Sequence, residues 1–217
     1  MVAMLTMKPV QGYYVEYEAL DGDMKAVRLL DESFDEGRKV PVIMGGRAID
    51  PTHVPTRILW KDRKKQPMGD LDSGPLLNIS DRAKDLIERF EPGVHQFFPV
   101  AFTHADGELI ENRWLLVVCN RLDTVDREHV QGFLLWRDKI WTPIADYLRD
   151  MPDEIPPGYD TSQPSKLVFN GGQIGGAHLW VDKHLQARVW MSDEFAAAWS
   201  AAGLTGWRAE NAFRETV

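Results

Sequence analysis

A two-residue alternation of apolar and polar positions marks the start of the chain. Within Gln11–Glu18, Tyr13, Val15 and Tyr17 alternate with more polar neighbours, which is the pattern of a half-buried strand. Asp21-Gly22-Asp23 is a turn signal. The sequence therefore predicts a hairpin whose returning strand lies within Met24–Leu30.

A helical period follows the short apolar strand predicted over Leu76–Ile79. Ser80 is a favourable N-cap residue, and Asp81 places a carboxylate in the first turn, where the helix dipole favours negative charge. Apolar residues then recur at helical spacing as far as Phe90, and Glu91-Pro92-Gly93 ends the helix.

The same signals return near the end of the chain. Ser192-Asp193 is expected to cap a second helix that runs to about Ala202, and a short extended piece begins at Trp207. Further strands are expected at Phe97–Phe102, Arg113–Asn120, Phe133–Trp136, Lys166–Asn170, Ala177–Val181 and Ala187–Met191. These elements predict an α+β fold of mostly antiparallel sheets and a few short helices, with two strand–Ser-Asp–helix–strand modules.

Length and turn content suggest two parts. The 217 residues suit one large domain or two small ones. Residues 31–74 are rich in glycine, proline and charge, whereas the pattern becomes regular from residue 75. We therefore expect a β-rich N-terminal lobe over residues 1–74 and an α+β domain over residues 75–217.

The overall charge changes which partners are expected. There are 33 acidic and 25 basic residues, and the formal net charge is −8. This balance argues against binding a nucleic-acid backbone and favours a basic partner, although surface charge for solubility alone explains it equally well. Neither a signal peptide nor an apolar run long enough to span a bilayer is visible, so a cytoplasmic protein without membrane contact is expected.

The acidity is concentrated. Residues 16–36 contain eight acidic residues and two basic ones, Lys25 and Arg28. A basic cluster over residues 57–65 is too short to predict nucleic-acid binding and is expected to be a solvated loop.

No familiar catalytic or cofactor motif is present in the sequence. It contains no P-loop, no His-Glu-x-x-His and no Cys-x-x-Cys, so no metal or cofactor is expected. The glycine-rich stretch Gly171–Gly176 lies between two predicted strands and is interpreted as a hairpin connection, because a dinucleotide cradle would need a following helix.

Five residues are compared with known chemistry nonetheless. His178, Asp182 and His184 share a parity and resemble a metal-ligand set, but their apolar neighbours favour an ordinary strand. Cys119, the one cysteine, follows an apolar run and is expected to be a core residue rather than a nucleophile. His95 has no evident catalytic partner nearby in the sequence, which favours a structural role.

Two segments resemble motifs of a bacterial immunity-protein family of polymorphic-toxin systems, the α+β family numbered eleven. The first runs from Ile79-Ser80-Asp81 through Phe90-Glu91-Pro92-Gly93-Val94-His95-Gln96-Phe97-Phe98-Pro99-Val100. The second comprises His178-Leu179-Trp180, Val189-Trp190-Met191-Ser192-Asp193-Glu194 and Ala201-Ala202-Gly203-Leu204-Thr205-Gly206. The resemblance covers roughly residues 75–210.

The resemblance implies a non-enzymatic inhibitor that binds a cognate toxin and blocks its active site. An acidic surface suits a basic toxin, and the local charge excess leads us to expect the binding face at Asp31, Glu32, Asp35 and Glu36. Two other classes stay open: an adaptor for another basic protein, and an enzyme using His95 or the pair His178 and His184.

Overall fold

The computed structural model describes most of the chain. The described residues are 1–28, 30–31, 40–41, 45–62, 64–72, 74–136, 140–150, 153, 155, 157, 162, 164–185 and 189–216. Helices in this part are α1 (Met24–Val27), α2 (Asp81–Phe90), α3 (Ile144–Asp150), α4 (Gly171–Ile174) and α5 (Asp193–Ala201), with a 3-10 turn at Pro51–His53. Strands are β1 (Val2–Met7), β2 (Tyr17–Ala19), β3 (Leu30–Asp31), β4 (Val40–Pro41), β5 (Arg57–Trp60), β6 (Leu71–Asp72), β7 (Leu77–Ile79), β8 (Gln96–Thr103), β9 (Leu109–Val117), β10 (Arg121–Leu122), β11 (Phe133–Trp136), β12 (Ile140–Pro143), β13 (Val168–Asn170), β14 (Leu179–Asp182), β15 (Val189–Ser192) and β16 (Trp207–Thr216).

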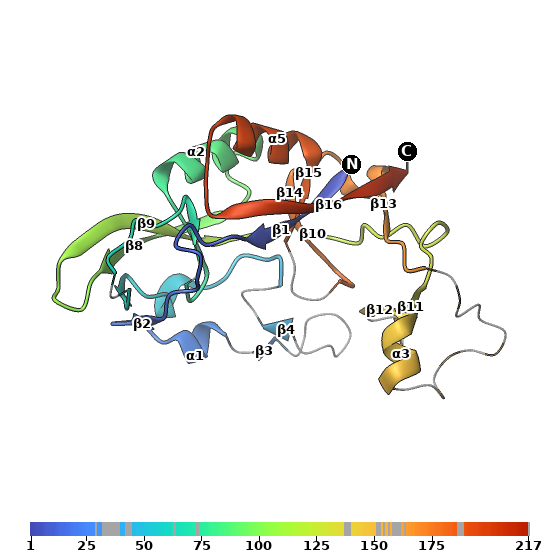
Figure 1. Ribbon diagram of the computed structural model, residues 1–217, viewed down its shortest axis with the longest axis horizontal. Coiled ribbons are helices and arrows are strands. Elements are labelled where there is room, and N and C mark those ends of the chain that lie inside the picture. Colours follow the sequence, from blue (N-terminus) through green and yellow to red (C-terminus); the bar gives the residue numbers. More distant parts are fainter. Residues whose placement is uncertain are drawn as a thin grey trace.

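Two six-stranded sheets form the body of the molecule (Figure 1). One has the order β2-β5-β8-β9-β7-β6, and the other has the order β10-β14-β15-β1-β16-β13. Most strand pairs are antiparallel, and parallel pairs join β5 to β8, β13 to β16 and β10 to β14. The α+β class predicted from the sequence is therefore confirmed.

Five strands and one helix of each sheet share one topology. In the first sheet the order β5-β8-β9-β7-β6 carries α2 between β7 and β8, and in the second the order β13-β16-β1-β15-β14 carries α5 between β15 and β16. Each strand pair of the first unit has the same relative direction, parallel or antiparallel, as the corresponding pair of the second unit. The parallel pair β5–β8, for example, corresponds to the parallel pair β13–β16. The second unit differs in one respect: its central strand is β1, from the beginning of the chain, where the first unit uses β9, which directly follows β8.

The two helix starts are also built alike. The hydroxyl of Ser80 accepts a hydrogen bond from the backbone N–H of Ala83, and that of Ser192 accepts one from Phe195. The backbone N–H of Ser80 donates to the carbonyl of Asp70, just before β6, and that of Ser192 donates to His178, just before β14. The Ser-Asp modules predicted from the sequence are thus the corresponding parts of the two structural units.

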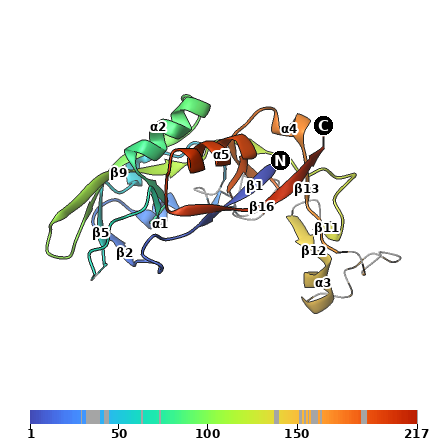
Figure 2. The same cartoon turned by 45° about the horizontal axis from the view of Figure 1, so that its top comes forward.

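The helices α2 and α5 lie side by side on one face of the sheets (Figure 2). The start of α2 meets the end of α5, where Arg82 donates to the carbonyl of Ala202, and the ring of Phe90 at the other end lies 5.3 Å from that of Phe195. The helices are therefore antiparallel. Buried residues of both helices and both sheets, including Leu86 and Trp199, form one shared core, so the two units are stabilised together.

The opposite faces of the sheets are covered separately. A second core, which includes Ile58, Trp60 and Phe102, lies between the first sheet and the N-terminal segments. A third, which includes Phe169 and Trp190, lies on the second sheet beside the hairpin of β11 and β12. This hairpin and α3 project at one end of the molecule (Figure 2).

Three local expectations were wrong. Strand structure in the first predicted strand is confined to Tyr17–Ala19, and the predicted return over Met24–Leu30 is the helix α1, because Asp23 accepts hydrogen bonds from the N–H groups of Lys25 and Ala26 and caps it. The stretch Gly171–Gly176 is not a hairpin. Its first four residues form α4, capped by Asn170, and β15, β1 and β16 separate the flanking strands β13 and β14 in the sheet.

Strands from both sides of residue 74 pair with one another. β1 lies between β15 and β16, and β5 pairs with β8. The division of the chain into residues 1–74 and 75–217 stays a prediction, and these pairings are among the contacts between the two segments. None of the helices described is long and apolar enough to cross a bilayer.

Candidate functional site

A buried carboxylate joins the two structural units. Glu91, which follows α2, is 7 % exposed. One of its oxygens accepts hydrogen bonds from the side chain of Asn120 and the backbone N–H of His178, and the other lies 2.7 Å from Nε2 of His95. Burial alone would raise the pKa of Glu91, but the hydrogen bonds from His95 and His178 outweigh it and hold the pKa below its usual value.

Both ring nitrogens of His95 form hydrogen bonds. Its Nδ1 accepts a hydrogen bond from the backbone N–H of Cys119 at 3.1 Å, so its Nε2 carries the proton that it donates to Glu91. The side chain of His95 is fully buried. This arrangement supports the structural role that the sequence favoured for His95.

Cys119 is half-buried and is not arranged as a nucleophile toward His95. Its sulfur donates to the carbonyl of Val117 at 3.4 Å, and its contact with His95 is made by the backbone. Burial raises the pKa of the thiol, which disfavours the reactive thiolate.

The residues that resemble a metal-ligand set have separate structural partners. His178 precedes β14 and contacts the hydroxyl of Ser192 through Nδ1 at 2.8 Å, whereas the buried His184 follows β14 and faces Asp123. Asp182 is 1 % exposed, and its carboxylate accepts hydrogen bonds from Thr124 and from the N–H groups of His184 and Leu185. Among the residues that the structure describes, no group of three or more potential ligands converges on a metal position.

The acidic residues predicted to bind a partner are incompletely described. The backbone of Asp31 forms β3 and pairs with Val40 of β4. Glu32, Asp35 and Glu36 lie outside the described residues. Their role in binding stays a prediction.

Of the other acidic residues in this segment, some form hydrogen bonds within the fold and others are exposed to solvent. Asp21 accepts hydrogen bonds from Thr56 and Arg57, and Asp23 caps α1, so both carboxylates serve the fold. Although burial alone would raise the pKa of Asp21, these hydrogen bonds lower it. Glu16 and Glu18 are exposed, and Glu18 pairs with Lys61 at 2.9 Å.

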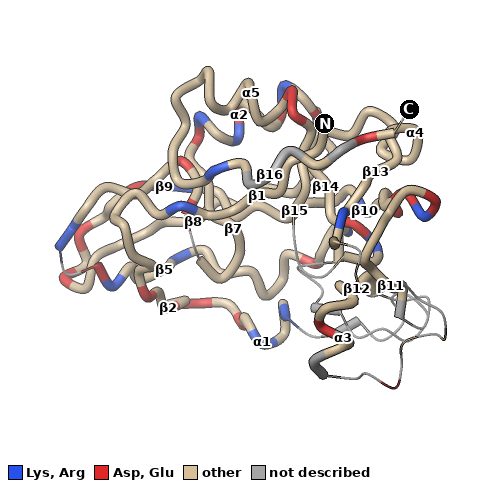
Figure 3. The backbone as a smooth tube through the Cα atoms, turned by 45° about the vertical axis from the view of Figure 1, so that its right-hand side comes forward, with Lys and Arg blue, Asp and Glu red and all other residues tan. Residues whose placement is uncertain are grey.

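The basic cluster at residues 57–65 offsets part of this acidity. Arg57, on β5, pairs with Asp21, and Lys61, next to β5, pairs with Glu18. Blue and red segments lie close together around β5 and β2 in Figure 3. Lys65 pairs with Asp106 and Glu108. The basic residues of the cluster that the structure describes are exposed to solvent, as expected, and Arg57 lies in a strand where a loop was expected.

Sequence reasoning missed an exposed stripe at the start of the acidic segment. Tyr14 and Leu20 are 63 % and 43 % exposed, and the exposed Glu16 and Glu18 lie between them at every second position. β2 is the edge strand of its sheet. The alternation was visible in the sequence, but its position at an edge depends on the pairing of β2 with β5.

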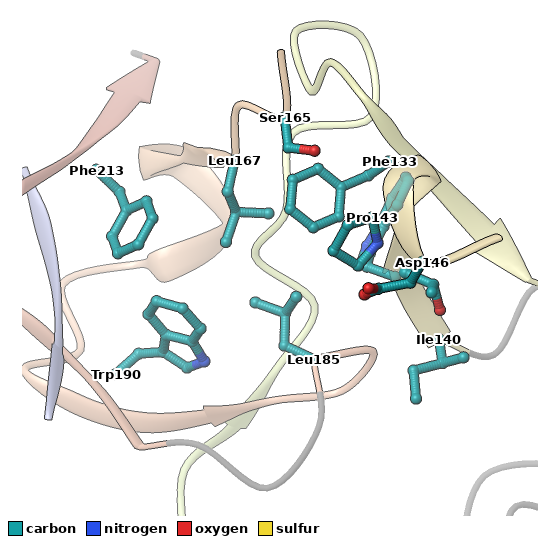
Figure 4. A pocket seen from close by; sticks show the side chains of 11 residues that line it. Phe133, Ile140, Pro143, Asp146, Ser165, Leu167, Leu185, Trp190 and Phe213 are labelled. Atoms are coloured by element: carbon teal, nitrogen blue, oxygen red, sulfur yellow. The ribbon is translucent and has the colours of Figure 1, made fainter. Parts of the chain in front are cut away.

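A cavity of about 410 Å³ lies between the projecting hairpin and the second sheet. Figure 4 shows Trp190, Phe213, Leu167 and Leu185 on the side of the sheet, and Phe133, Pro143 and Asp146 on the side of the hairpin and α3. This cavity was not predictable from the sequence, because the tryptophans that line it follow the apolar pattern of core residues.

Comparisons with known proteins place these features in a family. The model of the immunity protein family Imm11 matches residues 25–213. A comparison with curated protein sequences gave no match. The matched region includes α2, α5, and Glu91 with the three residues that hydrogen-bond to it, His95, Asn120 and His178. The chain therefore belongs to the immunity protein family Imm11.

Proposed function

We propose that this protein binds a cognate bacterial toxin and neutralises it by covering the toxin's active site with an acidic surface. The observation that carries the proposal is the family match over residues 25–213. Immunity proteins are generally non-catalytic, and the side chains of His95 and His178, which an enzyme would need, have structural partners here.

The charge of the chain supports a basic toxin as the partner. The net charge of −8 produces a field that attracts a basic protein, and local acidic groups then set its orientation. Our proposed binding face is the acidic group of Asp31, Glu32, Asp35 and Glu36. The exposed stripe of Tyr14, Glu16, Glu18 and Leu20 adds aromatic and apolar area, which interfaces need at their centres. A cytoplasmic location, without nucleic-acid or membrane contact, is part of the same proposal.

Association kinetics with the purified domain of a candidate cognate toxin test this face. The variant carries alanine at Asp31, Glu32, Asp35 and Glu36. A control variant carries alanine at four other exposed acidic residues, Asp85, Glu108, Glu128 and Glu194, so that both lose four negative charges. Removal of charges at the face is expected to slow association and weaken its dependence on salt more than removal of the control charges.

The outcomes separate the placement from the function. Equal rates for the two variants would show that only overall charge matters and would refute the placement at Asp31–Glu36. A tight complex that leaves the toxin active would favour an adaptor. Turnover of a substrate that is lost in His95→Ala but kept in an equally stable buried variant would favour the enzyme alternative.

A further inference from the structure

The outer edge of β2 is open in the part of the chain that the structure describes. β2 lies at one margin of the molecule, beside β5, and ends the first six-stranded sheet (Figure 3). The N–H of Leu20 donates to the carbonyl of Arg57, and the carbonyl of Glu16 accepts from the N–H of Lys61. In an antiparallel pair these bonds recur at every second residue, so Glu18, which lies between them, also directs its main-chain groups toward β5.

The main-chain groups of Tyr17 and Ala19 point the other way. Their N–H and C=O groups face away from β5, toward the open edge. No described residue forms a hydrogen bond with these groups. An unpaired edge of this kind is a template on which another extended segment adds as a strand, held by main-chain hydrogen bonds.

The side chains along this edge differ in charge between its two faces. On one face Glu16 and Glu18 are exposed; Lys61 pairs with Glu18, whereas Glu16 forms no ion pair with a described residue. On the other face Arg28 donates to the hydroxyl of Tyr17 at 3.2 Å, so a cation is already present there. Opposite charges on neighbouring strands stabilise a sheet and like charges oppose it. The edge therefore favours a strand with Lys or Arg at every second position and uncharged residues between them.

The two glutamates also select against other strands. An open edge invites non-specific pairing, and charged side chains along it are a common protection. A segment without basic residues would leave Glu16 beside it unpaired, and an acidic segment would be repelled. The net charge of −8 favours a basic segment at longer range as well.

We propose that the cognate toxin binds with an extended basic segment, which adds to the outer edge of β2 as a further strand and places Lys or Arg beside Glu16 and Glu18. This inference rests on the proposed function and names the way in which its partner docks. The main-chain contacts are those of Tyr17 and Ala19. A segment of this chain itself is the competing occupant of the edge, and the experiment distinguishes it.

Amide hydrogen exchange of the full chain tests the edge, because the expected pattern alternates along β2. In the free protein the amides of Glu18 and Leu20, which bond to β5, should exchange slowly, and those of Tyr17 and Ala19 should exchange rapidly. In the complex with the purified domain of a candidate cognate toxin, exchange at Tyr17 and Ala19 is expected to slow at least about 10-fold. Glu18 and Leu20 serve as internal controls, since they are bonded in both states.

Two capped peptides of about six residues, the usual length of a strand, test the charge pattern without a toxin. One alternates arginine and valine, and the other alternates glutamate and valine. Each is titrated into the ¹⁵N-labelled protein while the backbone amide signals are followed by NMR. The arginine peptide is expected to shift the signals of Tyr17 and Ala19, and the glutamate peptide is expected to leave them unmoved.

Variants with fewer charges locate the contact. Glu16→Gln combined with Glu18→Gln is expected to weaken binding of the arginine peptide at least about 3-fold at low salt. Asp85→Asn combined with Glu128→Gln removes the same charge from exposed positions elsewhere and should change the affinity less.

Two substitutions at Ala19 separate main-chain pairing from side-chain contact. Ala19→Pro removes the outward N–H and leaves the bonds to β5 in place, and proline is tolerated at such an edge position. This variant is expected to bind the toxin domain at least about 10-fold more weakly. Ala19→Ser keeps the N–H and should bind as the unmodified protein does. If Ala19→Pro does not fold, the exchange pattern of the unmodified protein decides.

The outcomes separate this inference from the proposed function. Slow exchange at Tyr17 and Ala19 in the free protein would overturn the inference, because the chain itself would then cover the edge. Exchange that the bound toxin leaves unchanged, or equal shifts with the two peptides, would also overturn it. A folded, active toxin domain that forms no complex would instead contradict the proposed function, and the arginine peptide would then decide whether the edge pairs with a basic strand.

Discussion

Asp70 and His178 hold equivalent places in the two structural units, and each contacts the serine that caps the helix of its own unit. The hydroxyl of Ser80 donates to the Asp70 carboxylate at 2.7 Å, and Nδ1 of His178 lies 2.8 Å from the hydroxyl of Ser192. Each also reaches the other unit: Asp70 accepts from Thr205, after α5, and the backbone of His178 donates to Glu91, after α2. A histidine that resembled a metal ligand in the sequence is thus the counterpart of a structural aspartate.

Both capping serines are expected to stabilise the protein to a similar extent. Ser80→Ala and Ser192→Ala each remove the acceptor for a helical N–H, and each should lower the free energy of unfolding by about 1 kcal/mol. Urea denaturation measures this. Ser200→Ala, at an exposed position within α5, is the control and should cost nothing. A loss in one serine variant without a loss in the other would contradict the equivalence of the two units.

Glu91→Gln should destabilise the protein by about 1–3 kcal/mol, because a neutral amide replaces a buried carboxylate that accepts three hydrogen bonds. The pH dependence should change as well. The lowered pKa of Glu91 means that its contribution is complete above the unfolded-state pKa and is lost as the pH falls through the folded-state pKa. Denaturation at several acidic pH values should therefore show that the free energy of unfolding falls less steeply with decreasing pH in Glu91→Gln than in the unmodified protein. The exposed control Glu128→Gln should keep the pH dependence of the unmodified protein.

Asp126 should dominate the most acidic part of the stability curve. A hydrogen bond from Thr216 is the largest cause of its low pKa, and contacts from His129 and the backbone N–H of Glu128 add to it, so that the pKa falls to about 2. Because a depressed pKa stabilises the folded state above the unfolded-state value near 4, this contribution should disappear between about pH 4 and pH 2. In Asp126→Asn, the free energy of unfolding should not show this decrease between about pH 4 and pH 2. An unchanged curve over this interval would mean that the carboxylate is not held by Thr216.

Gly206 lies where the two units touch, and a side chain there has no room. A Cβ atom at this position would lie 1.8 Å from the carbonyl oxygen of Leu71, and the φ angle is +92°. Gly206→Ala should therefore lower the free energy of unfolding by more than about 3 kcal/mol. Gly203→Ala is the matched control, with φ of +63° and nothing within 4 Å, and should cost only about 1–2 kcal/mol for its left-handed backbone. Thermal or urea unfolding that gives equal losses would refute the close approach.

The features that were predictable from the sequence depend on local signals. The limits of α2 follow from Ser80 at its start and Glu91-Pro92-Gly93 at its end, and both lie within the segment itself. The place of β16 does not follow from local signals. A short extended piece was expected to begin at Trp207, and β16 is a ten-residue strand between β1 and β13. Its neighbours are β1 (Val2–Met7), at the start of the chain, and β13 (Val168–Asn170), so no local pattern reveals them.

The candidate sites divide in the same way. The structural role of His95 was predicted, but its partners Glu91 and Cys119 come together only through the folding of α2, β8 and the end of β9. The cavity beside Trp190 was missed, because an apolar residue in a wall and one in a core have the same sequence pattern. The proposed acidic face depends on charge density alone, which shows where acidic residues concentrate but not what binds them.

Neutralisation of the cognate toxin is the most direct test of the central claim. The purified domain of a candidate cognate toxin is titrated with the purified protein, and the heat of binding and the remaining toxin activity are measured in the same series. Our account predicts a stoichiometric complex with a Kd on the order of nanomolar, and toxin activity that falls in proportion to the complex formed. A folded, active toxin domain that gives no heat of binding, and retains full activity with this protein in excess, would contradict it.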